Sequence, residues 1–159
     1  MSRIKPYFLF WAILLGTFIA DQYTKHLIHT KLSPHERITI WGDFFGIVHV
    51  HNYGAAWGIL AGHGWFLSAL AIVALLAIFL YRKALEMQTT YIQVVFGLIC
   101  SGILGNLVDR LRFGYVIDFL DFLIISYRWP SFNIADSCIF CGVVLHLWHT
   151  WKHAPAKEG

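Results

Sequence analysis

The sequence predicts an all-α membrane protein with four transmembrane helices, a small extracytoplasmic β-hairpin or sheet, and a short outer connection between helices three and four. The composition is 58% hydrophobic and 13% charged, with a mean hydropathy of +0.61, unlike a soluble protein. The chain contains four uncharged apolar stretches, at 7–20, 65–81, 89–108 and 137–151. With their flanks, each can form a helix of roughly 17–22 residues, enough to cross a hydrocarbon core. The 159 residues accommodate one such domain, spanning 1–159.

The first stretch continues past Asp21 toward Lys25. It resembles a signal peptide because Arg3 and Lys5 precede it, but Phe18 and Ala20 occupy the positions where small residues mark a cleavage site. We therefore expect a retained helix. The second stretch shows no polar face over 72–80, which argues against a helix of a soluble bundle.

The outer segment between the first two helices predicts a β-hairpin over 37–51. Apolar residues alternate with polar ones on both sides of Gly42-Asp43 and Gly46. Aromatic residues gather near the turn, as is typical of a membrane interface: Trp41, Phe44 and Phe45. The hairpin is expected either to shape a groove for a lipid-borne substrate or to cap the bundle.

Four crossings place both termini and the 82–88 connection on one side of the membrane. Its basic residues are concentrated near helix ends, which favours the cytoplasm. These residues are Arg3, Lys5, Arg82, Lys83, Lys152 and Lys157. Seven of the nine acidic residues fall on the other side, all except Glu86 and Glu158. The working face is therefore expected to be extracytoplasmic.

Six of the nine histidines also belong to the outer side. His49 and His51 would point to the same face of a strand and suggest a metal pair. The sequence offers no evident third ligand, so we expect surface histidines and no metal. Cys100, Cys138 and Cys141 lie within predicted helices and are interpreted as packing residues.

Five aspartates lie at or beside the outer ends of the helices: Asp21, Asp109, Asp118, Asp121 and Asp136. Carboxylates near hydrocarbon are costly unless they are paired, neutralised or hydrated, so they are functional candidates. Two carboxyl groups brought together would provide acid–base chemistry. Each motif also has a structural interpretation. Asp21 and Lys25 can form an i,i+4 ion pair, Asp109 and Arg110 a surface pair, and Asn133 an N-cap with Asp136 at the third helical position.

Five ordered blocks then reveal a family resemblance over nearly the whole chain. The chain resembles the lipoprotein signal peptidases (signal peptidase II), the membrane aspartyl proteases of bacteria. The blocks are Asp21-x-x-x-Lys25, Asn52-x-Gly54-Ala55-Ala56, Gly105-Asn106-Leu107-x-Asp109-Arg110, Val116-Ile117-Asp118-Phe119 and Phe132-Asn133-x-Ala135-Asp136-Ser137. Two positions differ from the family pattern, with Tyr53 where Thr is usual and Trp57 where Phe is usual.

The resemblance implies cleavage of diacylglyceryl-modified prolipoproteins just before the lipidated cysteine, in the bacterial cytoplasmic (inner) membrane. It implies that Asp118 and Asp136 are the catalytic pair. The implied site-lining residues are Asn52, Gly54, Asn106, Arg110 and Asn133, and the implied supporting residues are Asp21, Lys25 and Asp109. Expected partners are these substrates and membrane lipids, not nucleic acid, and we expect a monomer that needs no cofactor.

Two carboxyl groups sharing one proton can activate water and protonate the leaving amine, so hydrolysis needs no metal. The chain shows no His-Glu-x-x-His motif, and no lysine for a Ser–Lys dyad lies in 110–137. Two other classes stay open from the residues alone. A proton-coupled transporter would need ionisable residues in the helix middles, which are absent. A non-catalytic lipoprotein binder would tolerate loss of Asp118 or Asp136.

Overall fold

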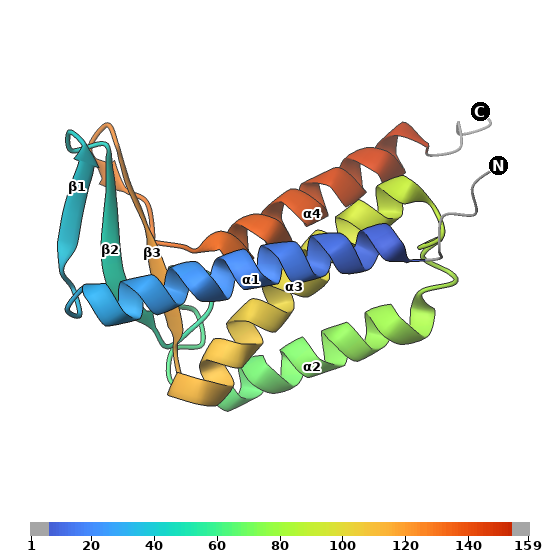
Figure 1. Ribbon diagram of the computed structural model, residues 1–159, viewed down its shortest axis with the longest axis horizontal. Coiled ribbons are helices and arrows are strands. Elements are labelled where there is room, and N and C mark those ends of the chain that lie inside the picture. Colours follow the sequence, from blue (N-terminus) through green and yellow to red (C-terminus); the bar gives the residue numbers. More distant parts are fainter. Residues whose placement is uncertain (1–6, 154–159) are drawn as a thin grey trace.

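A bundle of four helices carries a small antiparallel sheet at one end (Figure 1). The computed structural model describes residues 7–153. Three points lie at the end of the bundle away from the sheet (Figure 1). They are the start of α1, the connection between α2 and α3, and the end of α4, as four predicted crossings would require. The elements are α1 (Phe8–Lys31), β1 (Arg37–Trp41), β2 (Phe45–Asn52), the 3-10 helix η1 (Ala56–Gly58), α2 (Gly64–Tyr81), α3 (Thr90–Phe113), β3 (Val116–Ile124), β4 (Tyr127–Arg128) and α4 (Ile134–Lys152).

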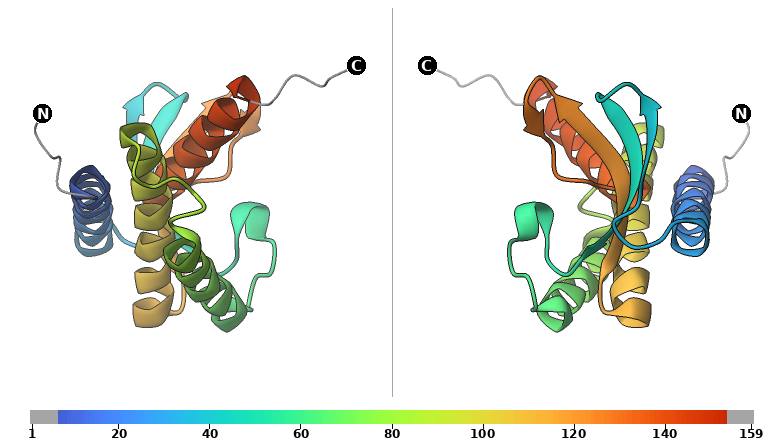
Figure 2. Two further views of the ribbon diagram at one scale, coloured as in Figure 1. Left: turned by 90° about the vertical axis from the view of Figure 1, so that its right-hand side faces the viewer. Right: turned by 90° about the vertical axis from the view of Figure 1, so that its left-hand side faces the viewer.

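Helix α3 is the central element of the bundle, between α1 on one side and α2 and α4 on the other (Figure 2). Glycine allows its closest approach to α4. A Cβ atom at Gly102 would lie 2.2 Å from the backbone oxygen of Ala135, which is inside van der Waals contact. Because Gly102 has no side chain, the start of α4 can pack directly against α3.

The predicted hairpin of β1 and β2 is confirmed, but it belongs to a larger sheet with the strand order β1-β2-β3-β4. The short outer connection predicted between α3 and α4 contains two further strands, β3 and β4, which the sequence analysis did not identify. In the central pair, Val50 lies opposite Asp118 and Asn52 opposite Val116. The sheet therefore brings Asn52 and Asp118 to neighbouring positions, with β3 running in front of α3 in the right-hand view of Figure 2.

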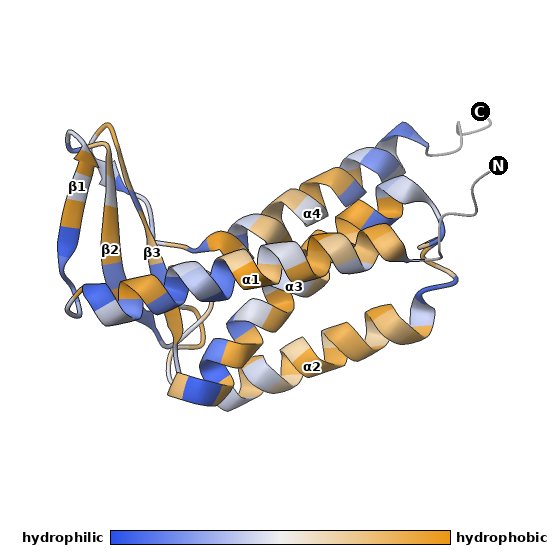
Figure 3. Ribbon diagram, in the orientation of Figure 1, coloured by the Kyte–Doolittle hydropathy of each residue, from blue (hydrophilic) through white to orange (hydrophobic). Residues whose placement is uncertain are grey.

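The outside of the bundle is apolar along most of its length (Figure 3). Helix α2 exposes Leu70, Val73, Leu76 and Phe79, among other large side chains, which a soluble protein would bury. Two helices, Gly64–Tyr81 and Thr90–Phe113, are long and apolar enough throughout to cross a membrane. Helices α1 and α4 are of similar length.

All four helices extend beyond the predicted apolar stretches. The first reaches Lys31, the third Phe113, and the fourth begins at Ile134. The polar residues at these ends continue the helices because they are paired inside the protein, as described below. Of the basic residues that suggested the orientation, Arg3, Lys5 and Lys157 lie outside the described residues.

Candidate active site

A cavity of about 910 Å³ opens at the sheet end of the bundle. It lies between the 50–61 segment, the outer half of α3, residues 129–132 and the first turns of α4. Two aspartates line it, Asp118 from β3 and Asp136 from α4, and we refer to them as the cavity aspartates. The other polar lining residues include Asn52, Asn106 and Arg110.

Asp118 is almost fully buried and accepts two amide hydrogen bonds. Nδ2 of Asn52 donates to its Oδ2 at 2.9 Å, and Nδ2 of Asn133 donates to its Oδ1 at 2.7 Å. Burial, followed by the nearby charge of Asp136, raises the pKa of Asp118 to about 7, although both amide bonds oppose that shift. Asp118 can therefore hold or release a proton near neutral pH.

Asp136 belongs to the capping box that starts α4. The predicted N-cap is confirmed, since Oδ1 of Asn133 accepts from the backbone N–H of Asp136 at 2.9 Å. In return, Oδ2 of Asp136 accepts from the backbone N–H of Asn133 at 3.2 Å. Its Oδ1 accepts from Nδ2 of Asn106 at 2.7 Å. The side chain of Asn133 thus contacts one cavity aspartate while its backbone holds the other.

The orientation of three asparagine amides follows from their surroundings. In each case a donor that is part of the framework occupies the carbonyl oxygen, so the NH₂ group must point to a cavity aspartate. The occupying donors are the backbone N–H of Gly54 for Asn52 (2.9 Å), Nζ of Lys25 for Asn106 (3.0 Å) and the backbone N–H of Asp136 for Asn133 (2.9 Å). The cavity aspartates therefore face three pre-oriented amide donors.

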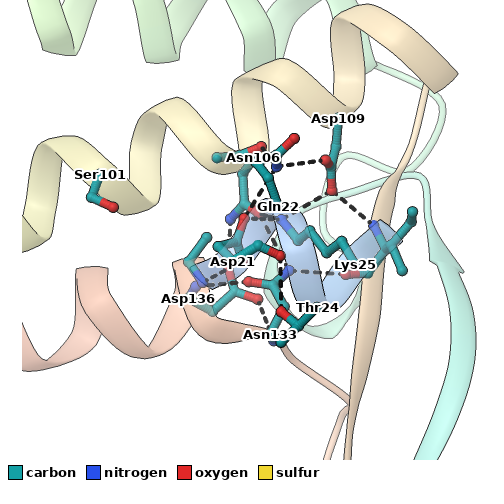
Figure 4. Close-up of polar contacts among 12 residues, drawn as sticks. Asp21, Gln22, Thr24, Lys25, Ser101, Asn106, Asp109, Asn133 and Asp136 are labelled. Carbon is teal, nitrogen blue, oxygen red and sulfur yellow. Dashed lines mark hydrogen bonds and ion pairs between the residues drawn. The ribbon is translucent and has the colours of Figure 1, made fainter. Parts of the chain in front are cut away.

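Lys25 is buried behind the cavity and has all three of its donors satisfied (Figure 4). Its Nζ lies 2.9 Å from Oδ2 of Asp21, 2.9 Å from Oδ2 of Asp109 and 3.0 Å from Oδ1 of Asn106. The i,i+4 pair of Asp21 and Lys25 is thus confirmed. Gln22 joins the two carboxylates by donating to both Asp21 and Asp109, a role that the sequence analysis missed.

The two carboxylates beside Lys25 also hold the backbone of the site. Oδ1 of Asp21 accepts from the backbone N–H of Ala135 at 2.9 Å. Oδ2 of Asp109 accepts from the backbone N–H of Ile117 at 3.2 Å. Ala135 and Ile117 each immediately precede a cavity aspartate. The interpretation of Asp109 and Arg110 as a surface pair is therefore wrong, because Asp109 turns inward to Lys25.

Arg110 instead fastens the segment that follows β2. Its Nη2 donates to the backbone oxygen of Gly54 at 3.0 Å, and Nη1 donates to that of Asn106 at 3.4 Å. Gly54 has no room for a side chain, because a Cβ atom would lie 2.7 Å from the backbone oxygen of Ile59. The resemblance had grouped these residues, and the structure brings them together at the cavity.

Two tryptophans stand at the cavity, Trp57 from η1 and Trp129 from the segment after β4. Their rings meet edge to face with centroids 5.7 Å apart, and both are substantially exposed. Trp57 adopts a left-handed backbone conformation, with φ of 55°. Among the aromatic residues noted in the sequence analysis, Trp57 lines the cavity. Trp41, Phe44 and Phe45 belong to the far end of the hairpin.

Asp121 does not belong to the cavity. It is buried in the sheet, where its Oδ2 pairs with Nε of Arg37 at 2.6 Å and also with Arg128. These contacts link β1, β3 and β4. Among the five aspartates noted in the sequence, Asp121 therefore has a structural role in the sheet.

The histidine pair is also more elaborate than the sequence indicated. His49 and His51 do point to one face of β2, and His29 of α1 joins them there. Burial lowers the pKa of His51, and the charges of neighbouring histidines lower it further. His29 is thus a possible third ligand that was not evident from the sequence.

The fold and the site define an integral membrane protein with a cavity that holds two aspartates at one end of a helical bundle. The family model described as "Signal peptidase (SPase) II" matches residues 13–152. The chain belongs to the signal peptidase II family, which makes it a protease.

Relatives and solved structures agree with this assignment. A lipoprotein signal peptidase of Desulforapulum autotrophicum is 43% identical over 146 residues, covering 86% of this chain and 88% of that protein. One of Alteromonas mediterranea is 41% identical over 145 residues, covering 89% and 79%. A bacterial membrane enzyme solved by the in meso method at 2.3 Å superposes with a TM-score of 0.84 at 34% identity, covering 94% and 93%.

Proposed function

We propose that this chain is a lipoprotein signal peptidase of the aspartic type. It removes the signal peptide from diacylglyceryl-prolipoproteins by hydrolysing the bond just before the lipidated cysteine. The observation that carries the mechanism is that Asp118 and Asp136 both line one cavity and are both bound by Asn133. The names of the relatives support the substrate class.

In the proposed reaction the cavity aspartates share one proton. The ionised carboxylate removes a proton from a water molecule, which attacks the scissile carbonyl carbon. The protonated carboxyl group donates a hydrogen bond to the carbonyl oxygen and then supplies a proton to the leaving amine. The raised pKa of Asp118 places its titration near neutral pH, which suits a carboxyl pair that shares one proton.

The amide groups around the cavity aspartates serve this reaction because they restrict the movement of the two carboxylate side chains. Asn52 and Asn106 are each fixed by a framework donor, so neither carboxylate has to reorganise when charge shifts between them. Arg110 carries the permanent positive charge in the cavity lining, and its bond to Gly54 holds the edge along which a peptide would lie.

We further propose four membrane-spanning helices in a monomer of the bacterial cytoplasmic membrane, with cytoplasmic termini. The exposed apolar residues of α1 and α4, such as Leu15, Ile19, Phe140 and Leu147, would otherwise contact water. The cavity then lies at the extracytoplasmic face, where a translocated prolipoprotein presents its cleavage site. Its lining is more apolar than polar, which suits a lipid-borne substrate.

The proposal is tested with a lipidated prolipoprotein in a gel-shift assay. We expect Asp118→Asn and Asp136→Asn each to abolish cleavage, because an amide keeps the shape of the side chain but cannot act as a base. Asp43→Asn is the matched control, since Asp43 is exposed on the hairpin. Size-exclusion profiles in detergent establish that the variants are folded. Activity above a few per cent in either folded variant contradicts the two-aspartate mechanism and favours a binder or another nucleophile.

A further inference from the structure

Three histidines from two elements converge outside the proposed catalytic pair. His29 belongs to the last turns of α1, and His49 and His51 belong to β2. Each offers a ring nitrogen, and the three nitrogens lie within 4.8 Å of one another. His49 is buried, His51 is half-buried and His29 is exposed, so the group opens from the interior toward solvent.

The tautomer of His49 is determined by its backbone partner. Nδ1 of His49 lies 2.9 Å from the backbone oxygen of Leu32, which can only accept a hydrogen bond. Nδ1 therefore carries the hydrogen, and the lone pair of Nε2 points to the other two rings. A ring N–H donated to a backbone carbonyl is also the usual arrangement of a metal-binding histidine, because it fixes the ring and raises the basicity of the other nitrogen.

The spacing of the two β2 histidines fits a shared metal ion. Nε2 of His51 lies 3.2 Å from Nε2 of His49. Two imidazole nitrogens bound tetrahedrally to one Zn²⁺ are about 3.3 Å apart, given Zn–N distances near 2.0–2.1 Å. A metal ion can therefore replace the hydrogen bond between them without moving either ring far. His51 then carries its hydrogen on Nδ1, so the ring stays neutral and no proton is released.

Aromatic neighbours hold the two outer rings in place. The ring of Tyr115 stacks on His51 with centroids 3.9 Å apart, and Phe113 lies 5.1 Å from His29. His29 needs only a side-chain adjustment to come within ligand distance, because its exposed position at the end of a helix leaves it room.

We propose that His29, His49 and His51 form a binding site for a divalent transition-metal ion of the Zn²⁺ type, with water as the fourth ligand. Imidazole nitrogens select such ions over Mg²⁺ and Ca²⁺, which prefer oxygen. The ion fastens the end of α1 to β2. Because Asn52 follows His51 directly and donates to Asp118, the ion stabilises the strand that supports the cavity without taking part in hydrolysis.

The test uses the full-length protein in detergent without a polyhistidine tag. Titration with Co²⁺ reports on geometry, since tetrahedral Co²⁺ absorbs visible light strongly, and displacement by Zn²⁺ gives the zinc affinity. We expect one ion per chain and a higher thermal midpoint with Zn²⁺, but no effect of Mg²⁺. His29→Gln and His51→Gln are expected to weaken Zn²⁺ binding at least tenfold and to remove the rise in midpoint.

Matched controls are His26→Gln and His63→Gln, which change exposed histidines outside the group and should leave binding unchanged. His29→Gln alters an exposed side chain, so its loss of binding cannot be attributed to misfolding if its metal-free melting curve matches the wild type. The proposal is overturned if wild-type protein binds no stoichiometric Zn²⁺. It is also overturned if His29→Gln and His51→Gln bind as tightly as the controls.

Discussion

Asp21 and Asp109 both pair with the Lys25 ammonium group, each through an oxygen 2.9 Å from Nζ. Each uses a remaining acceptor position to hold a backbone N–H, at Ala135 and Ile117 respectively. One buried cation therefore fixes the two chain segments that carry the cavity aspartates. Asp21, Lys25 and Asp109 do not line the cavity, but they position the residues that do.

Replacing Lys25 with methionine should therefore disable the enzyme and destabilise it. The change leaves two buried carboxylates without their cation, a loss that typically costs about 3–5 kcal/mol. It also removes one of the two donors to Oδ1 of Asn106 and leaves only Nδ2 of Asn133. We expect cleavage to fall at least tenfold and the thermal midpoint to drop, measured by gel shift and by melting in detergent. Lys31→Met, which changes an exposed lysine of the same helix, should behave like the wild type. Equal activity of both variants would contradict the positioning role.

Gly105→Ala should damage the site through Asp21. A Cβ atom at this position would lie 2.6 Å from Oδ2 of Asp21, the oxygen that binds Lys25. We expect reduced activity and a lower thermal midpoint. Gly16→Ala provides the comparison, because a Cβ atom there meets nothing within 4 Å. That change in an exposed helix position should stabilise the protein by up to about 1 kcal/mol. A harmless Gly105→Ala would show that the Asp21 carboxylate can move freely.

Activity should decline as the pH rises through about 7. Burial, followed by the charge of Asp136, raises the pKa of Asp118 from 3.8 to about 7, so the shared proton is lost above that pH. The same shift affects stability. Its contribution is full below pH 3.8 and is lost as the pH rises toward 7, because there the folded state binds a proton that the unfolded chain has released.

The charge effect can be isolated with Asp136→Asn, which removes the neighbouring carboxylate. The pKa of Asp118 should fall in this variant, as followed by the infrared band of its protonated carboxyl group. An unchanged titration would mean that burial alone sets the pKa of Asp118. A wild-type rate that stays constant between pH 6 and 8 would contradict the shared proton.

Cleavage should depend on the diacylglyceryl group of the substrate. Two acyl chains contribute roughly 0.8 kcal/mol for each buried CH₂ group, which holds the scissile bond near the membrane. Comparing lipidated and unlipidated prolipoprotein in one detergent measures the effect, and we expect at least a hundredfold difference in kcat/KM. Equal rates for the lipidated and unlipidated substrates would mean that the cavity recognises only the peptide. Trp57→Ala should raise KM in this assay more than Trp41→Ala, because only Trp57 lines the cavity.

Chelators and reagents directed at serine or thiol groups should leave hydrolysis intact. The proposed reaction uses neither a metal ion nor a covalent nucleophile, and a metal ion at the histidine group would support only the fold. We expect protein stripped with EDTA to keep at least half of its activity while melting at a lower temperature. Complete inhibition by EDTA that is reversed by Zn²⁺ would place the metal in the reaction itself.

The helices were predictable because uncharged apolar stretches of this length typically form membrane-spanning helices. The capping box of Asn133 and Asp136 and the pair of Asp21 and Lys25 were also predictable, since both depend on spacing within one helix. The hairpin of β1 and β2 followed from alternation around glycines. These are all local features, in which the partners lie within a few residues of one another.

Strand β3 could not be predicted in the same way. Its sequence, from Val116 to Ile124, contains two aspartates, and only pairing with β2 explains why both are buried. Gln22, Trp129 and His29 were missed because their partners come from other elements. The distinct roles of Asp118 and Asp121 depend on tertiary neighbours, amides for the first and arginines for the second.

Asn133 contacts Asp118 through its side chain and Asp136 through its backbone, so both contacts form only when this part of the chain has been synthesised. Asn133 and Asp136 leave the ribosome after Asp118, and Asp118 obtains one of its two amide partners only when the start of α4 has folded. A chain whose α4 has not yet folded therefore lacks Asp136 in the cavity and one amide donor to Asp118. On the proposed function, proteolytic capacity appears only after α4 has been inserted, so a nascent chain that lacks α4 cannot cut peptides that pass through the same membrane.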